Sequence, residues 1–111
     1  MNVFDYFTAG ACNLDGRYGT KSWDWKTYFQ KRKELEEQGV DIILVDMIDH
    51  PVDGSTPISN ELFTGNYPEG TYFVLYCHSG ATSGSLQKKL APEFPHYEFI
   101  NLEGGIRAYY S

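Results

Sequence analysis

The sequence is poor in three features that would assign it to other protein classes. It has two cysteines, Cys12 and Cys77, which are too few for the disulfide framework of a small secreted domain. It has no apolar run near the roughly 20 residues that cross a bilayer, and its first residues lack the basic start of a signal peptide. Basic residues number 9 against 15 acidic ones, a net charge of −6, so neither nucleic acid nor membrane is an expected partner. We therefore expect a soluble, cytoplasmic protein with reduced thiols.

A chain of 111 residues with 16% aromatic residues is expected to fold as a single domain over residues 1–111, because this length accommodates one hydrophobic core. Strands are predicted at Asn2–Phe7, Asp41–Asp46, Tyr72–Cys77 and Tyr97–Leu102. The glycine-rich segment 10–19 is a predicted loop. The segment 49–70, broken by prolines and glycines, is a long loop with at most a short helix near Glu61.

Two helices are predicted between these strands. The first has Ser22 as its N-cap and ends at Gly39. Its aromatic face is predicted from helical spacing to comprise Trp25, Tyr28, Phe29, Arg32 and Leu35, with Trp23 also on this helix. The second covers Ser83–Ala91 and is ended by Pro92, and a short helical turn follows Gly104–Gly105. The alternation of strands and helices predicts an α/β domain with a parallel sheet.

The segment Cys77–Ser83 (CHSGATS) places a thiol between a predicted strand and a predicted helix. Ligands bind at the carboxyl ends of strands in such sheets, and a loop that enters a helix points backbone N–H groups inward. These groups lower the pKa of a cysteine thiol, and the resulting thiolate is a nucleophile. Gly80 permits tight curvature of the loop, and hydroxyl donors come from Ser79, Thr82 and Ser83. The segment therefore indicates nucleophilic chemistry at Cys77.

Together with three other segments, this loop resembles the rhodanese-like sulfurtransferase domain in its single-domain form. The loop follows the family pattern C-x-x-G-x-[RT], and Asn101–Tyr109 (NLEGGIRAY) is similar to the closing element N-L-x-G-G-I-x-A-W. Asp46 matches the aspartate of L-x-D-V-R, and Gly54–Pro57 falls where the family has G-H-I-P. The resemblance covers residues 22–111 and leaves residues 1–21 as an atypical N-terminal segment.

The resemblance implies a central, mostly parallel sheet of about five strands with helices on both faces. The sequence departs from the family at two framework positions. Ile48 stands where the family has an arginine, and Ser55 replaces the histidine of G-H-I-P. These departures concern how typical the sequence is more than its chemistry.

The resemblance also implies sulfur transfer through a persulfide on Cys77. The thiolate takes sulfur from a small donor, thiosulfate or 3-mercaptopyruvate, and passes it to a thiol, to cyanide or to a protein cysteine. The expected binding loop consists of His78, Ser79, Gly80, Ala81, Thr82 and Ser83, with the N–H groups of residues 78–82 aimed at the sulfur. Because this loop holds no lysine or arginine, it favours 3-mercaptopyruvate over the thiosulfate dianion. Arg107 is a candidate substrate contact.

No cofactor is expected, and no metal, because His50 and His96 lack ligand spacing with each other or with a cysteine. Three alternatives remain open for the Cys77 loop. The first is a catalytically silent binding or regulatory module of the same family. The second is thiol redox or arsenate-reductase-like activity with Cys12 as the resolving thiol. The third is a phosphatase-like enzyme, which Ser83 disfavours because it stands in place of the phosphate-binding arginine.

Overall fold

The computed structural model describes residues 21–59, 61–64 and 67–110. The predicted strand at Asn2–Phe7 and the predicted loop at 10–19 lie outside these residues. In chain order the elements are β1 (Ser22–Trp23), α2 (Trp25–Glu37), β2 (Ile42–Asp46), β3 (Ser55–Pro57), β4 (Tyr72–Tyr76), α3 (Ala81–Glu93), β5 (Glu98–Leu102) and α4 (Gly105–Tyr109).

The apolar runs of β2, β4 and β5 form the centre of the sheet. The strand order is β1-β5-β4-β2-β3, and every described pair of neighbours is parallel. Strands buried on both faces need apolar residues at successive positions, and therefore these runs do not alternate with polar residues. The predicted α/β class with a parallel sheet is confirmed.

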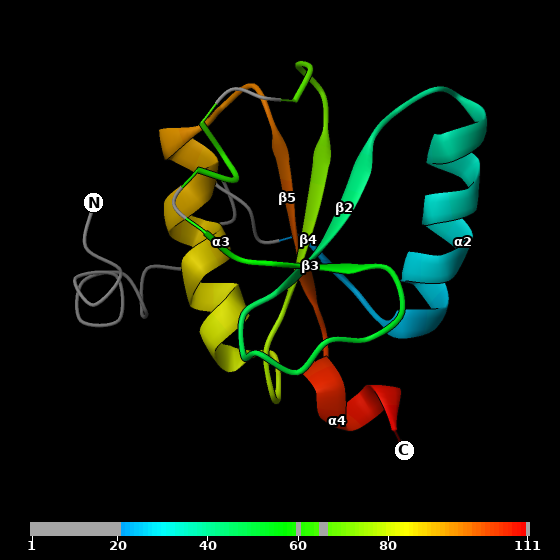
Figure 1. The fold of residues 1–111 in the computed structure, drawn as a ribbon, viewed down its shortest axis with the longest axis vertical. Coiled ribbons are helices and arrows are strands. Elements are labelled where there is room, and N and C mark those ends of the chain that lie inside the picture. Colours follow the sequence, from blue (N-terminus) through cyan, green and yellow to red (C-terminus); the bar gives the residue numbers. More distant parts are fainter. Residues whose placement is uncertain (1–20, 60, 65–66, 111) are drawn as a thin grey trace.

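Helices cover both faces of the sheet, as Figure 1 shows with α3 on one side and α2 on the other. Successive residues of β4 face opposite cores, because side chains alternate along a strand. Val74 and Tyr76 belong to the core that includes Trp25 of α2 and Ile106 of α4. A second core, on the α3 face, contains Phe73 and Leu75 of β4 together with Leu62, Phe63, Leu86, Leu90, Tyr97 and Phe99. The helix spacing predicted for α3 is confirmed, since Leu86 and Leu90 lie together in that core.

The prediction that Ser22 caps the first helix is wrong, because Ser22 and Trp23 form β1 and pair with Asn101 and Leu102 of β5. Asp24 is the N-cap, and one of its carboxylate oxygens accepts the Thr27 N–H at 2.7 Å. Trp23 therefore belongs to the sheet edge rather than to the helix. A strand of only two residues has too little apolar periodicity to be recognised in a sequence.

Of the predicted aromatic helix face, Trp25 and Tyr28 are buried, whereas Phe29 remains 55% exposed. The other boundaries shift by small amounts. The predicted start of α3 at Ser83 is two residues late, and Pro92 lies inside the last turn of α3 instead of ending it. The chain leaves the helix at Phe94, whose N–H still donates to the Leu90 carbonyl at 2.9 Å.

The predicted long loop 49–70 contains the edge strand β3, a strand that the sequence did not predict. Its three residues pair with Leu44, Val45 and Asp46 of β2. A proline such as Pro57 is tolerated at a sheet edge, where its missing N–H breaks no ladder on the outer side. Near Glu61 the described residues form turns and no helix. Within the described ranges, no helix combines the length and the apolar character needed to cross a membrane.

Candidate active site

Cys77 directly follows β4, a central strand of the sheet, at the carboxyl edge where all the strands end. It is held between the sheet and the start of α3, and only 3% of its surface is exposed. The three residues after it, 78–80, carry the chain from β4 to the first turn of α3. The position is the ligand-binding edge expected for a parallel α/β sheet.

Gly80 makes the turn into α3. Its φ angle is +101°, a left-handed conformation that favours glycine, and it is the N-cap residue of α3. A Cβ on Gly80 would also lie 3.2 Å from the Gly104 nitrogen and 3.4 Å from the Leu102 carbonyl oxygen. The curvature predicted for the loop is therefore present, and it brings the loop against the segment that follows β5.

The Cys77 sulfur is surrounded by donors from the loop and from α3. The N–H of Gly80 donates to Sγ at 3.2 Å, the N–H of Ser83 donates at 3.3 Å, and Ser83 Oγ lies 3.3 Å from Sγ. Burial raises the pKa of the Cys77 thiol, but hydrogen bonds from the Ser83 hydroxyl and from the N–H groups of Ser83, Gly80 and Ser79 outweigh it. The pKa is consequently below the ordinary thiol value.

Of the predicted N–H donors, residues 78–82, Gly80 makes a hydrogen bond to Sγ, and none to it is described from His78, Ala81 or Thr82. Ser83 also supplies an N–H to the sulfur, although it lies one residue beyond the expected range. The reason is the early start of α3, which places Ser83 in the first helical turn, where backbone N–H groups have no partner within the helix. Ser83 is fully buried, so its N–H and hydroxyl are shielded from water.

The structure also brings Asn101 to this site, a residue for which the sequence indicated no role. Asn101 lies on β5 beside Leu75 of β4, and its Oδ1 accepts the Ser83 hydroxyl proton at 2.6 Å. A signal was present in the sequence, since Asn101 is a polar residue between the apolar residues Ile100 and Leu102. A polar side chain in a covered strand requires a hydrogen-bonding partner, which a single sequence does not identify.

Gly104 and Gly105 lie directly beneath the loop. A Cβ on Gly105 would overlap the Cys77 carbonyl oxygen and would lie 2.7 Å from the His78 carbonyl carbon. The Ile106 N–H donates to the Cys77 carbonyl at 2.8 Å, and the Arg107 N–H donates to the His78 carbonyl at 3.1 Å. The two hydrogen bonds attach α4 to the loop, and glycine at position 105 permits this close approach.

The remaining predicted residues occupy the rim of the site. The side chains exposed there are His78, Ser79, Ala81 and Thr82. Arg107 is brought to the loop through its backbone, whereas its side chain is exposed. Within the described part of the chain, the hydrogen bonds to the Cys77 sulfur come from the loop and α3, and none comes from Arg107. Cys12 lies outside the described residues.

The segment after β2 forms the wall on the other side of β4. Asp46 is buried, and its Oδ1 accepts the Ile48 N–H at 2.9 Å. The Met47 N–H donates to the Tyr76 carbonyl at 3.2 Å, next to Cys77. Ser55 Oγ accepts the Val52 N–H at 3.1 Å. Ile48 and Ser55, the two departures from the family pattern, thus belong to the framework rather than to the surroundings of the sulfur.

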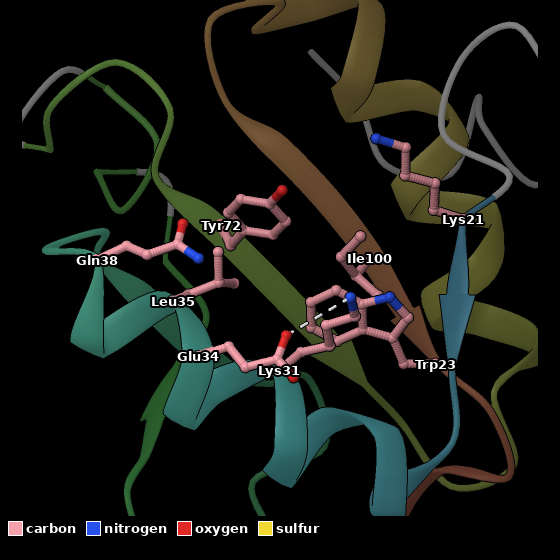
Figure 2. A pocket seen from close by; sticks show the side chains of 8 residues that line it. All are labelled: Lys21, Trp23, Lys31, Glu34, Leu35, Gln38, Tyr72 and Ile100. Atoms are coloured by element: carbon pink, nitrogen blue, oxygen red, sulfur yellow. Dashed lines mark ion pairs between the residues drawn. The ribbon is translucent and has the colours of Figure 1, made fainter.

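A separate hollow of about 280 Å³ lies between α2 and the sheet, as Figure 2 shows. Its aromatic wall is Trp23 stacked on Tyr72, with ring centroids 5.9 Å apart. Its lysines are paired with acids, Lys31 with Glu34 at 3.8 Å and Lys21 with Glu98 at 2.8 Å. Tyr72 begins β4 and Cys77 follows its end, a separation of roughly 16 Å at about 3.3 Å per strand residue. The hollow is therefore not part of the Cys77 site.

In the residues that the structure describes, no three His, Cys, Asp or Glu side chains gather in a way that could hold a metal ion.

Comparison with protein-family models found no match, and comparison with curated proteins also found none. Among solved structures, the chain is similar to the BH2092 protein from Bacillus halodurans, with a TM-score of 0.51 and 16% sequence identity. The likeness covers 81% of this chain and 71% of the other, and it supports the fold alone.

Proposed function

We propose that the protein is a sulfurtransferase that carries a sulfane sulfur on Cys77. The observation that carries the proposal is the convergence of the Gly80 N–H and the Ser83 N–H on one thiol at the carboxyl edge of the sheet, with Ser83 Oγ 3.3 Å from the same sulfur. Donors fixed around a sulfur stabilise negative charge on it before a substrate arrives. A lowered pKa increases the fraction of thiolate at neutral pH, and the thiolate is the form that attacks sulfur.

In the first step the Cys77 thiolate attacks the outer sulfur of the donor. With thiosulfate, a new S–S bond forms at Cys77, the donor S–S bond breaks, and sulfite leaves with the bonding electron pair. With 3-mercaptopyruvate, the C–S bond breaks and the enolate of pyruvate leaves and takes up a proton. Either donor leaves a Cys77 persulfide. Covalent catalysis of this kind divides one difficult transfer into two easier ones.

In the second step an acceptor thiolate or cyanide attacks the outer sulfur of the persulfide. The S–S bond to Cys77 breaks, and the Cys77 thiolate leaves with the electron pair, ready for another cycle. The outer sulfur extends about 2 Å from Sγ, which is one S–S bond length. The rim formed by Ser79, Ala81 and Thr82 is exposed, so an acceptor can approach from that side.

The charge of the site favours 3-mercaptopyruvate over thiosulfate as the donor. Residues 77–83 contain no lysine or arginine, and the whole chain carries a net charge of −6. The doubly charged thiosulfate then finds only backbone dipoles and hydroxyl donors in this segment, whereas 3-mercaptopyruvate carries less charge. We place the reaction in the cytoplasm, where thiols stay reduced, because a disulfide would remove the nucleophile.

Intact-mass analysis after incubation with each donor tests the proposal. The wild-type protein is expected to gain one sulfur atom, which a reducing thiol then removes. Cys77→Ser should gain none, whereas the matched variant Cys12→Ser, which retains Cys77, should gain one. Absence of the adduct with every sulfane donor, or an adduct that persists in Cys77→Ser, would overturn the proposal.

A catalytically silent module of the same fold is the second candidate, and the near-complete burial of Cys77 favours it. The two candidates differ in how the thiol reacts. A silent module has a thiol that resists iodoacetamide at neutral pH and forms no persulfide. In a sulfurtransferase, the Cys77 thiol reacts readily with iodoacetamide at pH values below roughly 8.5, the pKa of an ordinary thiol.

A further inference from the structure

The Ser83 hydroxyl has one proton and two neighbours that can accept it. Asn101 Oδ1 lies 2.6 Å from Ser83 Oγ, and Cys77 Sγ lies 3.3 Å from it on the other side. As described, the proton points to Asn101, so the hydroxyl oxygen presents its lone pairs to the sulfur. In that arrangement Ser83 can accept the S–H of a neutral thiol, but it cannot donate to a thiolate.

The opposite arrangement requires only a turn of the Asn101 amide. The oxygen and nitrogen of an amide group have nearly the same shape, and exchanging them places an N–H donor where the acceptor was. The Asn101 amide would then donate to Ser83 Oγ, and the hydroxyl proton would be released to point at the sulfur. Every hydrogen bond in the chain Cys77–Ser83–Asn101 is thereby reversed without moving the backbone.

The surroundings provide room for this amide on the side of α3. Gly84 faces Asn101, and a Cβ on Gly84 would lie 3.1 Å from Asn101 Nδ2. A glycine inside a helix costs about 1 kcal/mol relative to alanine. The Asn101 amide lies against the position where a Cβ of residue 84 would stand. The need for this space explains why residue 84 is a glycine. Burial of Ser83 prevents water from replacing Asn101 as its partner.

We propose that Asn101 is a positioning residue whose amide orientation follows the charge of Cys77. It accepts from Ser83 when the thiol is protonated, and it donates to Ser83 when the sulfur is a thiolate or a persulfide anion. The inference rests on the proposed function for its role in sulfur transfer. Its effect on the thiol is measurable without any sulfur donor.

Other titratable groups lie on the elements that pack against the loop. They are His78 in the loop itself, Asp46 at the end of β2, and Glu103 and Arg107 on either side of the paired glycines. The α3 turn that holds Ser83 contributes no charged side chain. Because these groups are unchanged in the variants below, a change in the titration of Cys77 reports on residue 101.

Two substitutions at residue 101 give opposite expectations. In Asn101→Asp, the carboxylate only accepts hydrogen bonds, so it keeps the Ser83 proton away from the sulfur. Alkylation of Cys77 by iodoacetamide at pH 7 is expected to slow about tenfold, and the midpoint pH of thiolate absorbance to rise. In Asn101→Leu, which has a similar volume and no polar group, the hydroxyl is free to donate to the sulfur. The midpoint is then expected not to rise.

A double variant distinguishes the effect that residue 101 exerts through the Ser83 hydroxyl from the direct electrostatic effect of an aspartate charge on Cys77. In Ser83→Ala the hydroxyl that the aspartate would hold is absent, so the slowing in Ser83→Ala/Asn101→Asp should be smaller than the product of the single effects. Thermal unfolding shows which variants are folded, and the leucine variant alone suffices if the aspartate variant is not. Equal midpoint shifts for aspartate and leucine, a raised midpoint in a folded leucine variant, or fully multiplicative slowing would overturn the proposal. The outcome is independent of persulfide formation, so the two proposals can fail separately.

Discussion

At the scale of single residues, the side chain of Ser83 is the buried side chain that contributes to stabilising the Cys77 thiolate. The backbone donors from Gly80 and Ser83 persist in most variants, whereas the Ser83 hydroxyl is removed by one substitution. A hydrogen bond to a charged group contributes roughly 1.5–3 kcal/mol, which corresponds to about one to two pKa units. Ser83 therefore adjusts the pKa of a thiol whose thiolate form the backbone N–H groups already stabilise.

Ser83→Ala is expected to raise the pKa of Cys77 and to slow alkylation at neutral pH by about tenfold or more. The sign follows from the thiolate, which loses a donor while the neutral thiol loses little. The measurement is the rate of iodoacetamide reaction between pH 6 and pH 10. Ser85→Ala, the same change two residues further along α3, is the control and should leave the profile unchanged. An unaltered profile in Ser83→Ala would show that the hydroxyl does not reach the sulfur.

Gly105→Ala is expected to destabilise the fold by at least about 2 kcal/mol, because a positive φ and an overlap occur at one position. The φ of Gly105 is +54°, and its new Cβ would overlap the Cys77 carbonyl oxygen. Gly39→Ala is the control. Gly39 has a φ of +80° but nothing within 4 Å of the added Cβ, so its cost should be about 1 kcal/mol.

Denaturant unfolding of both glycine variants measures the difference between them. The rate at which Cys77 reacts with iodoacetamide should also change in the Gly105 variant, because the loop has to move away from α4. Equal losses of stability in the two variants would contradict the close packing of Gly105 beneath the loop.

At the scale of elements, the site is held where four elements meet. The strand β4 delivers Cys77, α3 begins with its donors, β5 carries Asn101, and α4 holds the loop from below. The indole N–H of Trp25 in α2 donates to the Gly105 carbonyl at 2.8 Å, which connects α2 to the same place. The start of α2 therefore matters for the loop as well as for the helix.

Asp24→Ala is expected to lower the melting temperature at neutral pH and to have progressively less effect in acid. Hydrogen bonds from the side chain and the N–H of Thr27 lower the pKa of Asp24 in the folded protein. A carboxylate with a lowered pKa stabilises the fold above its unfolded pKa, and this contribution is lost as the pH falls through the folded value. Melting curves between pH 2.5 and pH 7 measure the difference.

The control for this series is Asp53→Ala, which removes an exposed aspartate from the loop before β3. It should change the melting temperature little at any pH. A difference between wild type and Asp24→Ala that stays constant down to the lowest pH would show that the negative charge of the capping carboxylate contributes nothing to stability.

At the scale of the whole molecule, net charge acts against an anionic reagent. The net charge is −6, and the Debye length falls from roughly 30 Å at 0.01 M salt to roughly 8 Å at 0.15 M. Repulsion between the protein and an anion is therefore screened as salt is added, and association becomes faster. The backbone donors at Cys77 act at contact distance and are much less affected.

Two alkylating reagents of the same chemistry test this effect. Added salt is expected to raise the rate of the anion iodoacetate about twofold or more, relative to neutral iodoacetamide, over this range. Thiosulfate should follow iodoacetate. A ratio of the two rates that does not change with salt would show that the field of the protein does not extend to the site.

Much of the fold was predictable, because its central strands carry their own signal. The runs IILV and YFVLY are apolar at successive positions, as strands buried on both faces require, and β5 has apolar residues at Phe99, Ile100 and Leu102. Two short strands escaped prediction. β1 and β3 have two and three residues, and they are strands because β5 and β2 lie beside them. Asp24 replaced Ser22 as the cap because that pairing keeps Ser22 in the sheet.

The sequence by itself determined the α/β class, the position of Cys77 after a buried strand and the glycines that its loop needs, because these depend on neighbours in the chain. Only the tertiary structure decided which groups surround the sulfur. Asn101 reaches Ser83 across 18 positions of sequence, and Gly105 lies beneath Cys77, because β4 and β5 are adjacent and parallel. Such contacts depend on strand order and register, which local residue preferences do not specify.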